Sequence, residues 1–386
     1  MSETSTGRVE TRFFTFGSMD QPVRLRNGAS LDQVTLAYET YGELDAARSN
    51  AIVVFHALTG SQHAAGYNAA VTGPGVRWTE EIHVGWWDGS IGPGKAIDTN
   101  RFFVICVNYL GGCYGSTGPA SIDLATGRPY GASFPAVSFA DMVDAHLPLL
   151  AHLGIERLHA AIGGSTGGLM ALSLATRHPD KVDIVIPIAC GVRATALHLI
   201  HNFEQISAIQ SDPAFRGGDY YDHDPPSSGL RLARMIGHKT FVSLRAMRDR
   251  ARDEILDHSE GPGTYRLNHP LESYMWHQGQ KFISRFDANS YLRIMQAWQT
   301  IDLAAEAGVV DLSELFTACK HQRYMVFSID SDVCFYPDEQ EELVHYLDLA
   351  DVPHRWITVH SDKGHDSFLV EPELFAPHLF DTLTRG

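Results

Sequence analysis

A serine placed between glycines, where an apolar run gives way to a helical pattern, constrains this chain more than any other feature. The sequence IGGSTGG occupies residues 162–168, with Ser165 at its centre. Residues 158–162 have the apolar composition of a buried strand, and residues 169–178 have helical spacing. The glycines two positions to either side of the serine permit a tight strand-to-helix turn. The sequence therefore predicts a nucleophile elbow, which exposes the Ser165 hydroxyl at the carboxyl edge of a sheet.

The rest of the first half alternates between strand and helix patterns. Continuous apolar runs predict strands covered on both faces, and a stretch with helical spacing stops at a glycine. The runs lie at residues 51–55, 102–107 and 182–189, and the helical stretch at residues 140–153. This alternation predicts an α/β fold with a mostly parallel, doubly wound sheet. An antiparallel pair, residues 11–16 and 34–41, is expected to open the chain.

The pattern changes after residue 190. Residues 191–318 are rich in helix formers, arginine, histidine and aromatic residues, and they contain no buried-strand pattern. Strand patterns return at residues 324–329 and 355–359, and residues 375–383 predict a closing helix. We therefore predict a core domain made of residues 1–190 and 319–386, with a helical cap inserted at residues 191–318.

Charge and composition exclude several classes of partner. A formal net charge of −16 argues against nucleic acid or an anionic membrane as the main partner. Residues 1–12 lack an apolar core of signal-peptide length, and no stretch reaches the roughly 20 apolar residues of a membrane span. We expect a cytoplasmic protein. The cysteines form no C-x-x-C pair, which predicts a reducing compartment and no metal site; they are Cys106, Cys113, Cys190, Cys319 and Cys334.

A serine nucleophile needs a base, and the base needs an orienting acid. In doubly wound hydrolase sheets the acid and the histidine follow the serine along the chain, each on a loop after a strand. Asp330 and Asp332 follow the strand at 324–329, and we prefer Asp332 because Asp330 still belongs to the strand end. His365, in a loop beside a glycine, is preferred as the base over His360, which continues its strand.

An oxyanion hole needs backbone N–H donors aimed at the developing charge. Thr166 directly follows the nucleophile, and Leu58 follows the strand-end His56, for which we expect a structural hydrogen bond. These residues support acyl transfer through a covalent intermediate on Ser165. They leave open whether water or another nucleophile takes the acyl group.

A series of motifs, in order along nearly the whole chain, resembles the homoserine O-acetyltransferases of the α/β-hydrolase superfamily. The motifs are LAYETYG at 36–42, HALTG at 56–60, GWWD at 85–88, GPGK at 92–95, LGGC at 110–113, GP at 118–119, PYG at 129–131, RGGDY at 216–220, FDANSY at 286–291 and GHD at 364–366. The resemblance implies an α/β-hydrolase fold with an inserted helical cap. The glycine-rich loop at residues 111–119 lacks the ending of a P-loop and is expected to be structural.

The resemblance also implies a reaction. Acetyl-CoA, as a co-substrate rather than a bound cofactor, would acetylate Ser165, and L-homoserine would then take the acetyl group in a ping-pong cycle that serves methionine synthesis. Arg234, in the ARM motif at 233–235, would hold the substrate carboxylate, and Asp366 would hold its ammonium group. A homodimer formed through the cap is implied as well.

Three departures from the family pattern concern the substrates. Thr166 replaces a usual methionine, which predicts a smaller and more polar pocket wall. Phe241 replaces a tyrosine and removes a hydroxyl, and an extra segment at about residues 71–83 precedes the tryptophan pair. The alternatives are therefore a succinyl donor, serine or another alcohol as acceptor, or a carboxylesterase that uses water.

Overall fold

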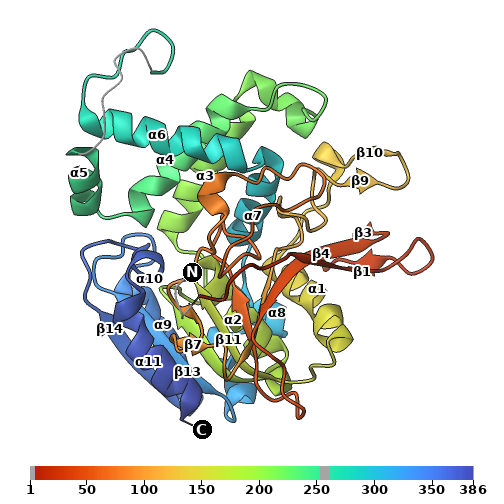
Figure 1. Cartoon of the computed structure of the whole chain (residues 1–386), viewed down its shortest axis with the longest axis vertical. Coiled ribbons are helices and arrows are strands. Elements are labelled where there is room, and N and C mark those ends of the chain that lie inside the picture. Colours follow the sequence, from red (N-terminus) through yellow and green to blue (C-terminus); the bar gives the residue numbers. More distant parts are fainter. Residues whose placement is uncertain (1–4, 253–260, 386) are drawn as a thin grey trace.

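The computed structural model describes residues 5–252 and 261–385, and its described part is built around one eight-stranded sheet (Figure 1). The strand order is β1-β4-β8-β5-β11-β12-β13-β14. Their bounds are β1 (Arg12–Phe16), β4 (Val34–Tyr41), β8 (Phe103–Val107), β5 (Ala51–Phe55), β11 (Leu158–Gly164), β12 (Val182–Ile188), β13 (Arg323–Ile329) and β14 (His354–Val359). Neighbouring strands from β8 to β14 are parallel, whereas β1 and β4 are antiparallel to each other and β4 is antiparallel to β8. This is the α/β-hydrolase fold.

Both faces of the sheet are covered, as continuous apolar strands require. In β5, Ala51, Val53 and Phe55 face one apolar cluster, and Ile52 and Val54 face the other. Outside the segment between β12 and β13, the helices of the first cluster are α1 (Phe139–His152), α2 (Thr166–Arg177) and α9 (Pro337–Leu349); those of the second are α10 (Ser367–Val370) and α11 (Pro372–Thr384). The sheet is therefore doubly wound.

Six helices lie between β12 and β13 in the described part of the chain. They are α3 (Ala196–Gln210), α4 (Ser227–Phe241), α5 (Leu244–Arg252), α6 (Pro270–Arg285), α7 (Ala288–Gln299) and α8 (Leu303–Ala307). Figure 1 shows α3, α4, α5 and α6 gathered at one end of the molecule, away from the lower part of the sheet. In contrast, α8 packs against α2 of the core. The exact cap boundaries at residues 191 and 318 remain a prediction.

The sequence predictions of the strands are confirmed to within two residues at each end. The helix after the serine begins at Thr166 rather than at residue 169, because Gly167 and Gly168 are themselves part of the helix. The features that were not predicted include helices α9 and α10 and three short strand pairs. These pairs are β2 (Val23–Arg24) with β3 (Ser30–Leu31), β6 (Ile91–Gly92) with β7 (Ile97–Asp98), and β9 (Ile122–Asp123) with β10 (Arg128–Pro129). None of the described helices is both long and apolar enough to cross a bilayer.

Candidate active site

Ser165 occupies the single-residue turn between β11 and α2. Its φ of 60° and ψ of −129° place a non-glycine residue in a strained backbone region, where such residues are found when a function requires the geometry. A Cβ on Gly163 would lie 2.2 Å from the Gly167 carbonyl oxygen, and a Cβ on Gly167 would lie 2.3 Å from the Phe55 carbonyl oxygen. Side chains at either position would therefore push strand, turn and helix apart.

Asp332 and His365 meet behind this turn although 33 positions separate them. His365 Nδ1 lies 2.6 Å from Asp332 Oδ2, and both side chains are almost completely buried. Asp332 Oδ1 accepts hydrogen bonds from the backbone N–H groups of Cys334 and Phe335, at 2.7 and 2.9 Å. The carboxylate is thus held by its own loop in the orientation that receives the imidazole.

The environment of His365 suits a general base. Burial disfavours the charged imidazole, but the Asp332 carboxylate outweighs this effect and raises the pKa of His365 above its usual 6.5. His365 Nε2 is buried and has no hydrogen-bond partner among the described residues. His365 and Ser165 line the same cavity, so this free lone pair and the serine hydroxyl share one compartment.

The rival acid and base form a separate pair. His360 Nδ1 lies 2.8 Å from Asp330 Oδ2, and the two side chains are 84% and 42% exposed. Asp330 also accepts a hydrogen bond from the backbone N–H of Ser361. The structure therefore brings Asp332 and His365 together beside Ser165 and leaves Asp330 and His360 at the surface, where they make no contact with the cavity.

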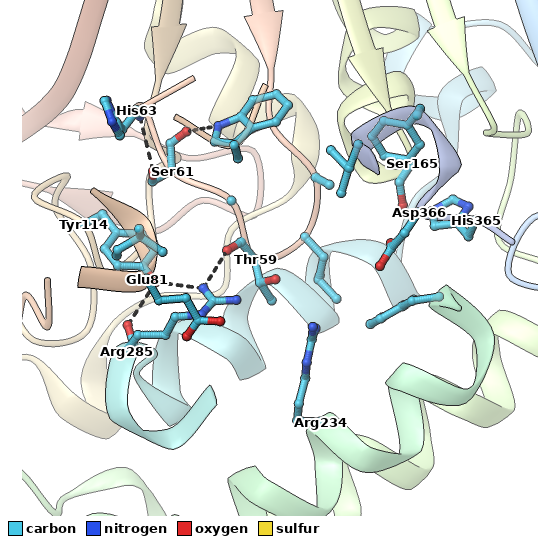
Figure 2. Close-up of a pocket in the computed structure, with 18 of the residues that line it drawn as sticks. Thr59, Ser61, His63, Glu81, Tyr114, Ser165, Arg234, Arg285, His365 and Asp366 are labelled. Atoms are coloured by element: carbon cyan, nitrogen blue, oxygen red, sulfur yellow. Dashed lines mark hydrogen bonds between the residues drawn. The ribbon is translucent and has the colours of Figure 1, made fainter. Parts of the chain in front are cut away.

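The cavity has a volume of about 270 Å³ and lies between the core and the cap (Figure 2). Ser165, His365 and Asp366 come from core loops, and Arg234 reaches in from helix α4. The wall between them is largely apolar, with Phe241 and Phe368 among its members. The cavity can therefore shield a reacting group from water while offering it a few charged partners.

Arg234 and Asp366 bring opposite charges to this cavity. The Arg234 guanidinium lies over the rings of Phe241 and Phe282, at 5.4 and 5.1 Å from the centroids, and makes no hydrogen bond to a described residue. Burial, and then the positive charge of Arg285, lower the pKa of Arg234, whereas Asp366 opposes this shift. Burial raises the pKa of Asp366, and the positive charges of His365 and Arg234 counteract it. The two side chains thus bring one positive and one negative charge to the same cavity.

The two predicted oxyanion donors come from two different segments of the core. Leu58 lines the cavity, in the loop after β5. Thr166 is the first residue of α2, where the backbone N–H has no partner within its own helix. Neither amide donates to another described residue.

Two departures from the family pattern can now be placed. The expected effect of Thr166 on the pocket wall is wrong: its side chain is fully buried in the core, and it does not line the cavity. Its Oγ1 has no hydrogen-bond partner among the described residues. Phe241 does line the cavity, where its ring contacts the Arg234 guanidinium. His56, expected to be structural, directs Nδ1 toward the carbonyl oxygen of Ala57, 2.8 Å away.

The sequence did not single out several residues on the far side of the cavity. Thr59, Tyr114, Arg285 and Glu81 line it there, as Figure 2 shows. Glu81 belongs to the extra segment, in the short helix Glu80–Ile82, and lies 3.6 Å from Lys281 of the cap. The extra segment, which directly precedes the tryptophan pair, was the available signal for Glu81.

Comparisons with known proteins identify the family and the fold of this chain. The family model for the alpha/beta hydrolase fold matches residues 50–372. The homoserine O-acetyltransferase of Solidesulfovibrio magneticus is 43% identical over 96% of this chain and 91% of its own length. The homoserine O-succinyltransferase of Alkalilimnicola ehrlichii is 43% identical over 95% of this chain and 92% of its own. The crystal structure of homoserine O-acetyltransferase from Bacillus anthracis is 26% identical, with a TM-score of 0.86 over 98% of each chain.

Proposed function

Because this chain belongs to the homoserine O-acetyltransferase family of α/β-hydrolase-fold proteins, we propose that it transfers an acetyl group from acetyl-CoA to the side-chain hydroxyl of L-homoserine. The transfer proceeds through an acetyl-enzyme on Ser165 and serves methionine synthesis. The observation that carries the proposal is the shared cavity: Ser165 and His365 lie beside Arg234 and Asp366, two opposite charges suited to an amino acid.

In the first half-reaction, His365 Nε2 takes the proton of the Ser165 hydroxyl while Oγ attacks the thioester carbonyl carbon. Asp332 holds the imidazole in the required tautomer and stabilises its charged form. The backbone N–H groups of Leu58 and Thr166 stabilise the resulting oxyanion. The carbon–sulfur bond then breaks, CoA leaves with the proton from His365, and the acetyl group remains as an ester on Ser165.

In the second half-reaction, the homoserine carboxylate binds Arg234 and its ammonium group binds Asp366. An arginine fork matches a carboxylate in two parallel hydrogen bonds. His365 removes the proton of the homoserine hydroxyl, whose oxygen attacks the acetyl carbonyl. The bond to Ser165 Oγ breaks, Oγ regains a proton from His365, and O-acetylhomoserine leaves.

The experiment combines donors and acceptors. Purified protein is incubated with acetyl-CoA or succinyl-CoA, with homoserine, serine or no acceptor, and free thiol is followed. We expect rapid thiol release only with acetyl-CoA and homoserine together. Preference for succinyl-CoA would assign the activity of the Alkalilimnicola ehrlichii relative instead. Equal thiol release without any acceptor would identify a hydrolase and contradict a transferase.

A homodimer through the cap is part of the proposal. Leu199, Ile200 and Phe203 are exposed on α3, and Leu232 is exposed on α4. Phe203 and Leu232 lie on opposite sides of one groove. Apolar groups gathered in this way are typical of a protein interface, and a second copy of the same surface would cover them. Phe203→Glu should shift the mass measured by light scattering from dimer to monomer; a wild-type monomer would contradict the dimer.

The proposed compartment is the cytoplasm. The five cysteines are buried and unpaired. Unpaired cysteines are typical of proteins in a reducing compartment. Fractionation of cells that produce the protein tests this location.

A further inference from the structure

The loop that carries Leu58 is held by side chains that bind its backbone carbonyl oxygens. In the core, Tyr109 Oη donates to the His56 carbonyl, and Trp86 Nε1 donates to the Ser61 carbonyl at 2.9 Å. Tyr41 Oη donates to the Gln62 carbonyl at 3.2 Å, and Cys106 Sγ also donates to the Ser61 carbonyl, at 3.5 Å. Arg285 Nη1 donates to the Thr59 carbonyl at 3.3 Å. Among the described residues, Arg285 makes the only hydrogen bond from the cap to residues 56–62.

Both the side chain and the backbone carbonyl of Arg285 make further contacts that hold the residue in place. It is the last residue of α6, and its Nη1 also donates to Tyr114 Oη at 3.1 Å. The Tyr114 hydroxyl in turn donates to the Arg285 carbonyl oxygen at 2.9 Å, and the guanidinium packs over the Phe282 ring at 5.3 Å. The side chain therefore cannot leave Thr59 without breaking other contacts (Figure 2).

The turn at residues 57–60 links this contact to the catalytic chemistry. Gly60 N–H donates to the Ala57 carbonyl at 3.0 Å, which closes a tight turn around Leu58 and Thr59. A Cβ on Gly60 would lie 2.8 Å from His56 Cβ, so only glycine fits at this position of the turn. The Thr59 carbonyl and the Leu58 N–H therefore belong to one hydrogen-bonded turn, two peptide units apart.

We infer that Arg285 is a positioning residue, which couples the cap to the oxyanion hole by holding the turn that presents the Leu58 N–H to the reacting carbonyl. This inference rests on the proposed oxyanion role of Leu58. Because Arg285 belongs to cap helix α6, this role makes formation of the acyl-enzyme depend on the packing of the cap against the core. Arg285 also lines the cavity, so the competing role is direct binding of the acyl donor.

Two donors separate these roles. Acetyl-CoA is large and would contact a donor-binding residue, whereas p-nitrophenyl acetate presents only a small ester to Ser165. Pre-steady-state release of CoA or p-nitrophenol is measured without homoserine. If Arg285 positions the turn, Arg285→Ala should lower acylation by both donors about 10- to 100-fold, since oxyanion donors contribute on this scale. The apparent affinity for homoserine in the second half-reaction should change less than twofold.

Added guanidinium ion supplies a second readout. It can occupy the space vacated in Arg285→Ala and donate again to the Thr59 carbonyl, so it should restore part of the acylation rate. Tyr114→Phe removes one support of Arg285 but keeps its bond to Thr59, and should cost less. His277→Ala, eight residues earlier on α6 and exposed, is the control and should leave both acylation rates unchanged.

The outcomes are distinct. Slower acylation by acetyl-CoA with unchanged acylation by p-nitrophenyl acetate would assign Arg285 to donor binding and overturn the inference. Unchanged acylation by both donors would overturn it as well. If Arg285→Ala does not fold, as judged by its melting temperature, Arg285→Lys and Tyr114→Phe are subjected to the same comparison. Failure of homoserine as an acceptor would contradict the proposed function alone, because acylation by p-nitrophenyl acetate requires no acceptor.

Discussion

His365 Nδ1 lies 2.6 Å from Asp332 Oδ2, in a region where both side chains are excluded from water. The contact joins the loop after β13 to the loop after β14, at the carboxyl edge of the sheet where Ser165 also lies. Because His365 Nε2 has no hydrogen-bond partner in the described part of the chain and His365 lines the cavity, the pair can accept a proton there.

Ser165→Ala should abolish acetyl transfer while leaving the fold intact. Removal of the hydroxyl eliminates the nucleophile, and the alanine keeps the Cβ that the turn already accommodates. The measurement is thiol release from acetyl-CoA with homoserine, together with the melting temperature. Ser133→Ala, at an exposed serine, is the control and should keep full activity. Substantial turnover by Ser165→Ala would show that another group is the nucleophile.

The pH dependence of acylation should reflect the Asp332 carboxylate. His365 acts as a base only when neutral, and its pKa is raised above 6.5, so the rate should fall as the pH drops through this raised value. Asp332→Asn should lower the rate about 10³- to 10⁴-fold. It should also move the acid limb to lower pH, because burial then acts on the imidazole without the opposing carboxylate. An acid limb that stays in place in Asp332→Asn would contradict this assignment.

His360→Gln should leave the rate within about twofold of wild type. His360 contacts Asp330 at the surface, away from the cavity, and an exposed ion pair of this kind contributes under about 1 kcal/mol to stability. The measurement is the steady-state rate with both substrates for His360→Gln, compared with the rates of wild type and of His365→Gln. A large loss of activity in His360→Gln with little loss in His365→Gln would reverse the choice of base.

Arg234→Ala should chiefly weaken homoserine binding. Its guanidinium is held between two aromatic rings and has no protein partner for its N–H groups in the described part of the chain. We expect the KM for homoserine to rise by about 10-fold or more, since a charge-assisted bidentate pair is lost, with a smaller change in acylation by acetyl-CoA. Lys239→Ala, an exposed cation on the same helix, is the control. An unchanged KM for homoserine would remove Arg234 from the acceptor site.

Thr166→Val should stabilise the protein without affecting catalysis. The buried Thr166 Oγ1 has no hydrogen-bond partner among the described residues, and an unpaired buried hydroxyl costs about 1 kcal/mol or more. Valine has nearly the same shape, and its backbone N–H remains available to an oxyanion. Urea unfolding should show a higher midpoint, with kcat within about twofold. A drop in stability would mean that the hydroxyl does have a partner.

Local patterns were sufficient to predict most of the fold. The apolar runs became β5, β8 and β12 because residues buried on both faces of a parallel sheet are apolar at every position. The turn around Ser165 was predictable for a related reason, since only glycine fits where strand and helix backbones nearly touch. Helix α9 was overlooked although Pro337 opens it at a position that favours proline.

The candidate site was predictable where each residue occupies a recognisable place in the chain. Ser165, Asp332 and His365 each follow a strand, so chain order and strand ends already indicated them. Asp332 could be preferred over Asp330, but the separation of the two acid–histidine pairs depends on loop geometry that no local pattern encodes. The inward direction of Thr166, which the sequence led us to place on the pocket wall, likewise follows from how α2 packs against the core.

Sequence patterns do not predict contacts between side chains and loops that lie far apart in the sequence. The residue types and spacings along the chain were enough to indicate a nucleophile, a base, an acid and the sheet that aligns them, because each follows from backbone sterics over a few positions. That Arg285 reaches the carbonyl of Thr59, 226 positions earlier, was settled only when cap and core packed together. Contacts of this kind depend on the relative placement of whole helices, and no short stretch of sequence carries that information.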